Sequence, residues 1–442
     1  MSEMMTRRRI VAVGASMGGG AALMSACAGG GQQSQPALVQ APVDLTWTFW
    51  EGAAQMAFID ATAAEVERAH PKIKLTKTPL TVATYDEKIL AMVTGGTPPD
   101  VTGTLRFTSA SWAVKGISTT LDQYLSRGGF KESDYFPNAI TPWRINGKLY
   151  ALPREVDLHT LWYNRQLFEQ AGVKPPDETW TWDTLITSGQ RLTKRDGDRA
   201  QFAFNVATNH KAWVAFAQQN GSKLWDKEVL PTKLLINTQT VYDAIQYIAD
   251  LRNKHRVSPT SQETTDLGGN FWPRGMLAMN YAEASQAASY ASTIKDFTYD
   301  VAVPPKGKQF GTWLGGASYT TPRGSTKREA AVQFILHASG VEGQKLIAQH
   351  NFGAPAIKSV ADSDLFLKSA TPQNKRAWRQ SFEWGAGPPM TPNWPEIEAA
   401  INTDLNQTWA GNRTAKASIE AAWPKVEALM QQAQDMVKQM PQ

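Results

Sequence analysis

The chain has 442 residues, with 45 Lys or Arg against 40 Asp or Glu and a formal net charge of +5. This near balance, without a basic block after the first ten residues, argues against a nucleic-acid-binding surface. The single cysteine, Cys27, rules out a disulfide bond within the chain and a thiolate metal site.

Residues 1–26 have the three parts of an export leader. Arginines at positions 7–9 precede a short apolar stretch, and Ser25 and Ala26 come directly before Cys27. The stretch is too short and too rich in glycine for a transmembrane span. The end of the leader resembles a lipoprotein signal peptidase site, which predicts lipidation of Cys27; a buried thiol is the alternative. The paired arginines leave Tat and Sec export open.

Residues 27–43 are predicted to be a flexible tether, because positions 29–42 are dominated by Gly, Gln, Ser and Pro. Removal of the leader takes away three basic residues and one acidic residue. The mature chain then has 42 basic and 39 acidic residues, a net charge of +3. Its length of about 415 residues exceeds what one core normally supports, so we expect two lobes.

Extended and helical segments alternate after the tether. Residues 45–50 and 73–76 have strand composition, and apolar residues at helical spacing lie between them up to His70. A helix is expected over 84–94, where Gly95 and Gly96 end it, and a third strand over 100–105. This order predicts a parallel α/β lobe, in which ligands bind beyond the carboxyl ends of the strands.

The chain contains 16 tryptophans, more than its 11 tyrosines and as many as its 16 phenylalanines. Tryptophan offers a flat apolar face and one N–H donor, which suits stacking on a sugar ring. Core packing is the alternative for each of them. The excess indicates that some tryptophans contact a ligand.

Short motifs follow one another in a fixed order along the chain: PPDV at 98–101, NGKLYALP at 146–153, LWYN at 161–164, FEQAGV at 168–173, WTW at 180–182, RGMLAM at 274–279, VPPKG at 303–307 and AAVQFI at 330–335. Their order resembles that in the extracellular solute-binding proteins of family 1. These proteins are the sugar-binding components of ABC importers, the maltose-binding type among them.

The resemblance implies an α/β fold of the two-lobed periplasmic-binding-protein type (type II), with three hinge crossovers and the ligand in the interlobe cleft. One lobe would comprise residues 44–155 plus 318–354, and the other 156–317 plus 355–442. The expected function is capture of a mono- or oligosaccharide by lobe closure and its delivery to a membrane permease. We expect a monomer, held by lipid at the outer face of the cytoplasmic membrane or in the periplasm.

The first candidate ligand contacts lie at the first crossover and the first strand end. By the resemblance, Asp157 occupies the position of a ligand-contacting carboxylate; a solvated hinge charge is the alternative. His159 would contact the ligand or satisfy the hinge backbone. Glu51 is expected to reach a hydroxyl, whereas Trp50 is either a ligand contact or strand core.

Further candidates follow the third strand and lie in the second lobe. Arg106 and Trp112 lie after that strand, and Trp112 is a candidate for ring stacking. Trp213 begins a helix, where core packing is the stronger interpretation. Tyr281 and Glu283 occupy a region where the family has a Gly-x-Trp element that this chain lacks.

The last candidates are glycine-rich or aromatic segments. Trp313 and Gly315 lie at the second crossover, where glycine lets backbone N–H groups approach ligand hydroxyls. Either Trp384 or Trp394 is expected to form an aromatic floor of the cleft.

The sequence predicts a binding protein and not an enzyme, without a cofactor or a metal. It has no HExxH motif and no Gly-x-Ser-x-Gly elbow. A glycine-rich run at 14–20 lies in the leader and follows no strand. The alternatives are a polyol, glycerol-phosphate or polyamine ligand, or a secreted glycoside hydrolase, which needs two carboxylates that flank one bond.

Overall fold

The computed structural model describes residues 39 and 41–440, apart from 127–128, 196–199 and 370. The predicted leader, Cys27 and most of the predicted tether lie outside the described residues.

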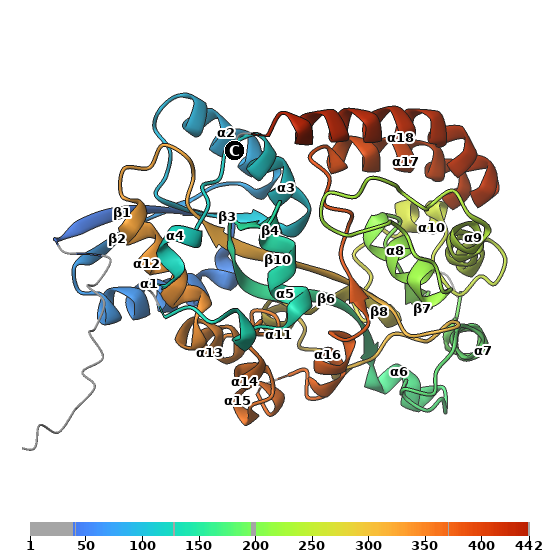
Figure 1. Ribbon diagram of the computed structural model, residues 1–442. Helices are drawn as coiled ribbons and strands as arrows, with labels where there is room; N and C mark the ends of the chain where they lie inside the picture. Colours follow the sequence, from blue (N-terminus) through green and yellow to red (C-terminus); the bar gives the residue numbers. More distant parts are fainter. Residues whose placement is uncertain (1–38, 40, 127–128, 196–199, 370, 441–442) are drawn as a thin grey trace, which may run out of the picture. The chain divides into compact units, whose positions relative to one another are not determined.

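A nine-stranded sheet runs through the described chain (Figure 1). Its order is β2-β1-β3-β10-β6-β8-β7, with β11 beside β10 and β9 beside β6, while β4 and β5 form a separate pair. The strands are β1 (Val43–Phe49), β2 (Ile73–Pro79), β3 (Val101–Leu105), β4 (Arg144–Ile145), β5 (Lys148–Leu149), β6 (Leu152–Asn164), β7 (Phe202–Asn205), β8 (Leu277–Glu283), β9 (Tyr299–Ala302), β10 (Thr312–Thr320) and β11 (Gly385–Ala386).

Helices cover both faces of this sheet. The longer ones are α1 (Met56–Ala69), α2 (Tyr85–Thr94), α3 (Arg106–Val114), α7 (Trp182–Leu192), α8 (His210–Gln219), α9 (Gln239–Asn253), α12 (Arg328–Ser339), α13 (Val341–Gln349), α17 (Trp394–Trp409) and α18 (Ala415–Lys438). The shorter ones are α4 (Asp122–Leu125), α5 (Pro137–Ile140), α6 (Arg165–Gln170), α10 (Ser261–Asp266), α11 (Ala287–Thr293), α14 (Lys358–Ala361), α15 (Asp364–Leu367) and α16 (Arg376–Ser381).

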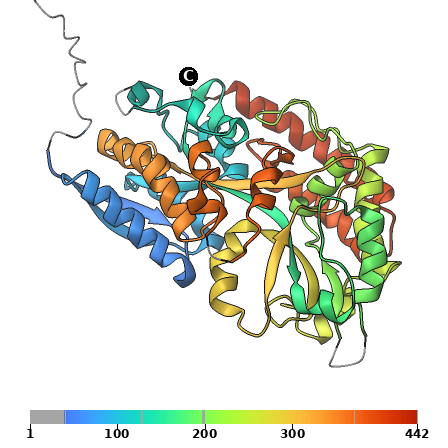
Figure 2. The same cartoon turned by 90° about the horizontal axis from the view of Figure 1, so that it is seen from below.

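The N-terminal part of the sheet is the predicted parallel α/β unit. β1 pairs in parallel with β2 and β3, and α1 and α2 connect these strands. Trp47 of β1 and Ile59 and Val66 of α1 are buried in one core cluster. The helices α12 and α13, from much later in the chain, lie beside α1 (Figure 2). The predicted strands and helices over 45–105 are therefore confirmed.

Two long strands, β6 and β10, cross from one part of the sheet to the other, and we call them the crossing strands. The first half of β6 pairs with β10, which also pairs with β3, whereas its second half pairs with β8 and β9. A register shift between Ala317 and Ser318 interrupts the pairing of the two crossing strands. The chain passes between the two parts of the sheet along these strands.

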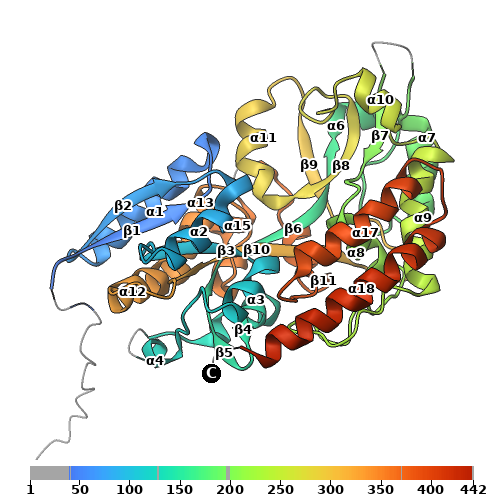
Figure 3. The ribbon, with the colours of Figure 1, turned by 90° about the horizontal axis from the view of Figure 1, so that it is seen from above.

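The C-terminal part has its own core. There α8 and α9 pack together, α18 packs on α9, and α17 and α18 run side by side (Figures 1 and 3). Leu161 of β6, Met279 of β8 and Ile401 of α17 belong to one buried cluster. The helices α14 and α15 contact α13, whereas α16 contacts β6 and β9.

Most tryptophans are core residues. All 16 lie within the described residues, and twelve of them are less than a tenth exposed. Trp162 of β6 is one example, because it contacts the rings of Tyr290, Tyr299 and Trp378 and donates its indole N–H to the carbonyl of Ala282. Core packing therefore accounts for most of the tryptophan excess.

Candidate ligand-binding site

A cavity of about 260 Å³ lies beside the crossing strands. Both strands contribute residues to it, together with the carboxyl ends of β1 and β3, the start of α8 and the 3-10 turn η7 (Ala284–Gln286). We call it the hinge cavity. Its lining residues are Trp50, Glu51, Gly52, Gln55, Val82, Leu105, Arg106, Phe107, Arg154, Glu155, Asp157, Lys211, Ser285, Gln286, Trp313, Gly315, Gly316 and Phe352.

Three charged side chains of the hinge cavity form a buried cluster. Arg154 Nη1 donates to Glu51 Oε1 at 2.6 Å, and Arg154 Nε donates to Glu155 Oε2 at 2.6 Å. All three residues are less than a tenth exposed. The guanidinium also lies over the rings of Trp50 and Phe352, at 4.9 and 5.0 Å from their centroids.

Arg154 keeps its positive charge in this cluster. Burial acts to lower the pKa of Arg154, but the carboxylates of Glu155 and Glu51 outweigh burial and raise that pKa above its ordinary value. Glu155 Oε1 also accepts a hydrogen bond from the backbone N–H of Ala317 at 3.1 Å. The cluster therefore ties the end of β1 to both crossing strands.

A second polar group surrounds Asp157, which is half-buried and lines the cavity. Its carboxylate accepts two hydrogen bonds from Ser285, from the backbone N–H at 3.0 Å and from the hydroxyl at 2.8 Å. Lys211 and Glu283 form an ion pair close by, with 2.6 Å between Nζ and Oε1. Asp157 is therefore held in one orientation from η7.

The surroundings shift the pKa values of Asp157 and Glu283 in opposite directions. Burial, followed by the negative charge of Glu283, raises the pKa of Asp157 to about 7. Burial also acts to raise the pKa of Glu283, but His159 and Lys211 outweigh it and lower that pKa. Because burial lowers the pKa of His159 to about 4, Lys211 is the cation that acts on Glu283 at neutral pH.

Aromatic side chains lie beside these charges. Trp50, Phe107, Trp313 and Phe352 all line the hinge cavity. Aromatic faces suit the C–H faces of a ring, and the fixed carboxylates and the ammonium group suit hydroxyls. This combination can hold a small, hydroxylated, ring-shaped solute.

The close approach of the crossing strands depends on glycine at one position. Gly316 has a φ of +128°, and a Cβ atom there would lie 2.5 Å from the carbonyl oxygen of Glu155. A larger residue would push β10 away from β6 at the cavity.

The hinge cavity brings together one group of the residues predicted from the sequence: Asp157, Glu51, Trp50, Arg106, Trp313 and Gly315. Within this group, Glu51 and Arg106 already have protein partners. The Arg106 guanidinium donates to the backbone carbonyl of Asn138 at 3.1 Å and forms an ion pair with Glu228.

A second group lies next to the cavity without lining it. His159 is buried, and its Nε2 lies 3.7 Å from Glu283 Oε1. Tyr281 is also buried, and its hydroxyl is 3.1 Å from that of Thr312. These residues surround the groups that line the cavity.

The remaining tryptophans of the prediction do not face the hinge cavity. Trp112, the candidate for ring stacking, is only 2% exposed and packs in a small core cluster with Tyr85 and Ile89. Trp213 and Trp394 are each 1% exposed and belong to the core of the C-terminal part. Because their rings are covered by core residues, none of these three reaches the cavity.

Trp384 also lies away from the hinge cavity. Its ring stacks on Phe310, with the centroids 4.3 Å apart. The expected aromatic floor from Trp384 or Trp394 is therefore absent from the described lining of the cavity.

The sequence analysis missed several lining residues, above all Arg154, Glu155 and Lys211. Arg154, Glu155 and Asp157 lie within four positions of a strand that is otherwise mostly buried. Charges in a strand buried on both faces need partners or a ligand, which is the signal that could have identified them.

No group of three or more His, Cys, Asp or Glu side chains among the described residues is placed to hold a metal ion. In the same part of the chain, no helix is long and apolar enough to cross a membrane.

Comparison with known proteins places the chain in a broad group of binding proteins. Residues 61–375 match the family described as bacterial extracellular solute-binding protein. The arabinooligosaccharide-binding protein of Bacillus subtilis is 28% identical over 222 residues, which are 48% of this chain and 49% of that protein. The chain thus spans about half the length of that relative. The sn-glycerol-3-phosphate-binding periplasmic protein UgpB of Escherichia coli is 22% identical over 86% of this chain and 91% of that protein.

Solved structures show the same fold. An ABC substrate-binding protein of Listeria monocytogenes, in complex with cycloalternan, has a TM-score of 0.80 and 21% identity, and covers 88% of this chain and 99% of its own. The cyclic alpha-maltosyl-1,6-maltose binding protein of Arthrobacter globiformis has a TM-score of 0.75 and 19% identity, over 89% and 100%. The predicted α/β, two-lobed periplasmic-binding-protein fold is confirmed.

Removal of Arg154 alone should destabilise the fold more than removal of all three charges of the buried cluster. Arg154→Met leaves the carboxylates of Glu51 and Glu155 buried and unpaired, so the free energy of unfolding should fall by about 3–5 kcal/mol. The triple variant Glu51→Gln/Arg154→Met/Glu155→Gln should recover most of this loss. Denaturant unfolding of the ligand-free proteins measures both effects.

The matched control is Arg68→Met, because Arg68 pairs with Glu65 while its side chain is 71% exposed. Its effect should be much smaller than that of Arg154→Met, because a solvent-exposed ion pair contributes little to stability. An Arg154→Met protein as stable as this control would contradict the role of the cluster.

The raised pKa of Asp157 predicts a pH-dependent stability. The unfolded chain releases this proton near pH 4 and the folded chain only near pH 7, so the free energy of unfolding falls as the pH rises through this window. Relative to Asp157→Asn, which does not titrate, the wild type should lose on the order of 2 kcal/mol between pH 5 and pH 7. Denaturant unfolding of both proteins at both pH values tests this; a constant difference would indicate an ordinary pKa.

Proposed function

Because this chain belongs to the bacterial extracellular solute-binding proteins, we propose that it is the substrate-binding component of an ABC importer for a carbohydrate. Its ligand is an extracellular mono- or oligosaccharide, which it delivers to a membrane permease. The observation that carries this proposal is the hinge cavity, where aromatic faces and oriented charged groups meet beside the crossing strands. Sugar recognition needs both kinds of group.

The charges that line the hinge cavity favour a neutral ligand. Three acidic side chains, Glu51, Glu155 and Asp157, stand against three basic ones, Arg106, Arg154 and Lys211. Most of them are already paired with each other or with neighbouring residues. A polyamine or a glycerol phosphate would meet no surplus of opposite charge there, so both rank below a neutral sugar.

Asp157 is the proposed hydroxyl acceptor, because Ser285 fixes its orientation and one side of it faces the cavity. Trp50, which is partly exposed, is the proposed contact for the ring. Trp313 lines the cavity but is only 2% exposed, and Gly315 offers backbone groups beside it. Glu51 and Arg106 act mainly by positioning, since their charges are used within the protein.

Closure of the two lobes over the ligand would present the form that the permease recognises. We propose one lobe of residues 44–155 plus 318–367 and another of residues 156–317 plus 368–442, which shifts the last boundary predicted from the sequence. The chain crosses between the lobes for the third time after Leu367 and not at residue 355, because α14 and α15 contact α13 of the first lobe. The protein acts as a monomer and binds its ligand without chemical turnover.

A ligand screen tests this function. The exported protein is incubated with neutral mono- and oligosaccharides, sugar alcohols, glycerol phosphates and polyamines, and thermal shift reports binding. A neutral sugar should raise the melting temperature and be recovered unchanged. Release of products from a glycoside would instead support a hydrolase.

Asp157→Ala should weaken binding of the sugar found in the screen by on the order of 2 kcal/mol, as for a lost charge-assisted hydrogen bond. The variant should not lower the melting temperature of the ligand-free protein, because folding raises the pKa of this carboxyl. The control is Asp364→Ala, whose side chain is 75% exposed on α15. Calorimetric titration measures the affinities, and equal affinities in both variants would remove Asp157 from the site.

We also propose export and lipid anchoring at Cys27. With a lipid on Cys27, the tether would hold the receptor within reach of its permease. Cys27→Ser should move the protein from the membrane fraction to the soluble fraction, whereas Ser34→Ala should not. Cell fractionation with mass analysis of the mature N-terminus distinguishes the two; a wild-type protein without lipid would overturn the anchor.

A further inference from the structure

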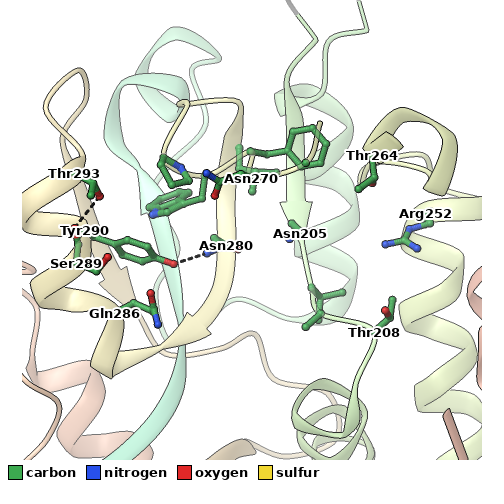
Figure 4. A pocket seen from close by; sticks show the side chains of 17 residues that line it. Asn205, Thr208, Arg252, Thr264, Asn270, Asn280, Gln286, Ser289, Tyr290 and Thr293 are labelled. Carbon is green, nitrogen blue, oxygen red and sulfur yellow. Dashed lines mark hydrogen bonds between the residues drawn. The ribbon is translucent and has the colours of Figure 1, made fainter. Parts of the chain in front are cut away.

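A second cavity of about 640 Å³ lies over the sheet face of β7 and β8, between α9, α10 and α11 (Figure 4). We call it the lateral cavity. It meets the hinge cavity at Gln286, which lines both. Its volume lies within the range of small-molecule sites, and it contains none of the residues predicted from the sequence.

The lining of the lateral cavity is rich in amide and hydroxyl groups. Asn280 is 8% exposed, and its Nδ2 donates to the Tyr290 hydroxyl at 3.2 Å, while its Oδ1 has no partner among the described residues. The indole N–H of Trp272, which is 3% exposed, also lacks a partner there. The carbonyl oxygen of Asn280 is therefore available to accept a hydrogen bond from a hydroxylated ligand in the cavity.

Arg252 of α9 is the one charged side chain among the described residues that line the lateral cavity. Figure 4 shows it directed from α9 toward the cavity, across from Gln286. Its guanidinium makes no hydrogen bond or ion pair with the described residues, and burial lowers the pKa of Arg252 without an opposing carboxylate. A half-buried guanidinium without a protein partner can form charge-assisted hydrogen bonds with an anionic group of a ligand in the cavity.

We propose that the lateral cavity is a second binding site, for a hydroxylated ligand with a carboxylate or phosphate group that Arg252 binds. The fork of a guanidinium matches both anions. The amide and hydroxyl side chains, among them Asn205, Thr208 and Asn280, bind the hydroxyl groups. This site differs from the hinge cavity, where positive and negative charges are balanced, and it does not depend on the proposed transport function.

Titration calorimetry on the full chain tests the proposal with three probes: glucose, glucuronate and glucose 6-phosphate. At least one anionic probe should bind at least about tenfold more tightly than glucose, since charge-assisted hydrogen bonds are the stronger ones. The carboxylate and phosphate probes distinguish the two sources of the anion. Binding should weaken with added salt.

Arg252→Gln should weaken binding of the preferred anionic probe at least about tenfold. The matched control is Arg256→Gln, which makes the same charge change on a 56% exposed side chain close by in sequence. Asp157→Ala should leave this binding unchanged, which separates the lateral cavity from the hinge cavity. If Arg252→Gln does not fold, Asn205→Asp, which adds a carboxylate to the cavity, should have the same effect.

Three results would overturn the proposal. The first is equal affinity for glucose and both anions, or no binding of any probe. The second is an Arg252→Gln or Asn205→Asp protein that binds the anionic probe as tightly as the wild type does. The third is a loss of affinity in Arg256→Gln as large as that in Arg252→Gln. Loss of the anionic probe in Asp157→Ala would assign it to the hinge cavity instead.

Discussion

The arrangement of the hinge cavity depends on one buried cation. Arg154 is held between Glu51 at the end of β1 and Glu155 on its own strand, and Glu155 in turn accepts the backbone N–H of Ala317 on β10. Three strands that are distant in sequence are thereby joined by charge where the sheet changes from one lobe to the other. The arrangement requires a close approach of the backbones, which is why Gly316 lies opposite Glu155. A neutral cluster of similar size would fill the space but would not orient carboxylates toward a ligand.

The ion pairs of Arg154 also determine which side chains of the hinge cavity remain free for a ligand. Glu51, Arg154 and Glu155 satisfy one another, so they contribute position and a fixed electrostatic field more than new hydrogen bonds. Asp157 differs, because its partner Ser285 is neutral and its pKa lies near neutrality. A hydroxyl that donates to the ionised carboxylate would favour that form. Affinity for a hydroxylated solute and the protonation state of Asp157 are therefore linked.

The fold was predictable from the sequence to a greater degree than the site. The alternation of strands and helices over 45–105 is local, and an ordered set of motifs extends over most of the chain, so both could be read directly. One partner of Arg154, Glu51, is 103 residues away. The charges in β6 could have indicated a site, but no local pattern indicates that Glu51 meets them. The number of tryptophans was a poor guide to the site for a related reason. Composition gives how many rings the chain has, but not which of them core residues cover. Trp112, Trp213 and Trp394 are all packed in core clusters. Asp157, Trp50 and Trp313 line the hinge cavity because they lie at strand ends or crossovers, which the topology of the sheet brings together.

The turn after β8 contributes to both the hinge cavity and the lateral cavity. Ser285 on this turn holds Asp157 of the hinge cavity, and the next residue, Gln286, lines both cavities. The hinge cavity combines balanced charges with aromatic faces, whereas the lateral cavity combines one unpaired guanidinium with amides and hydroxyls. The two proposals therefore differ in ligand charge: a neutral solute for the hinge cavity, and an anionic one for the lateral cavity, where only Arg252 is charged among the described lining residues. Because Gln286 lines both cavities, a shift of this turn would change the shape of both.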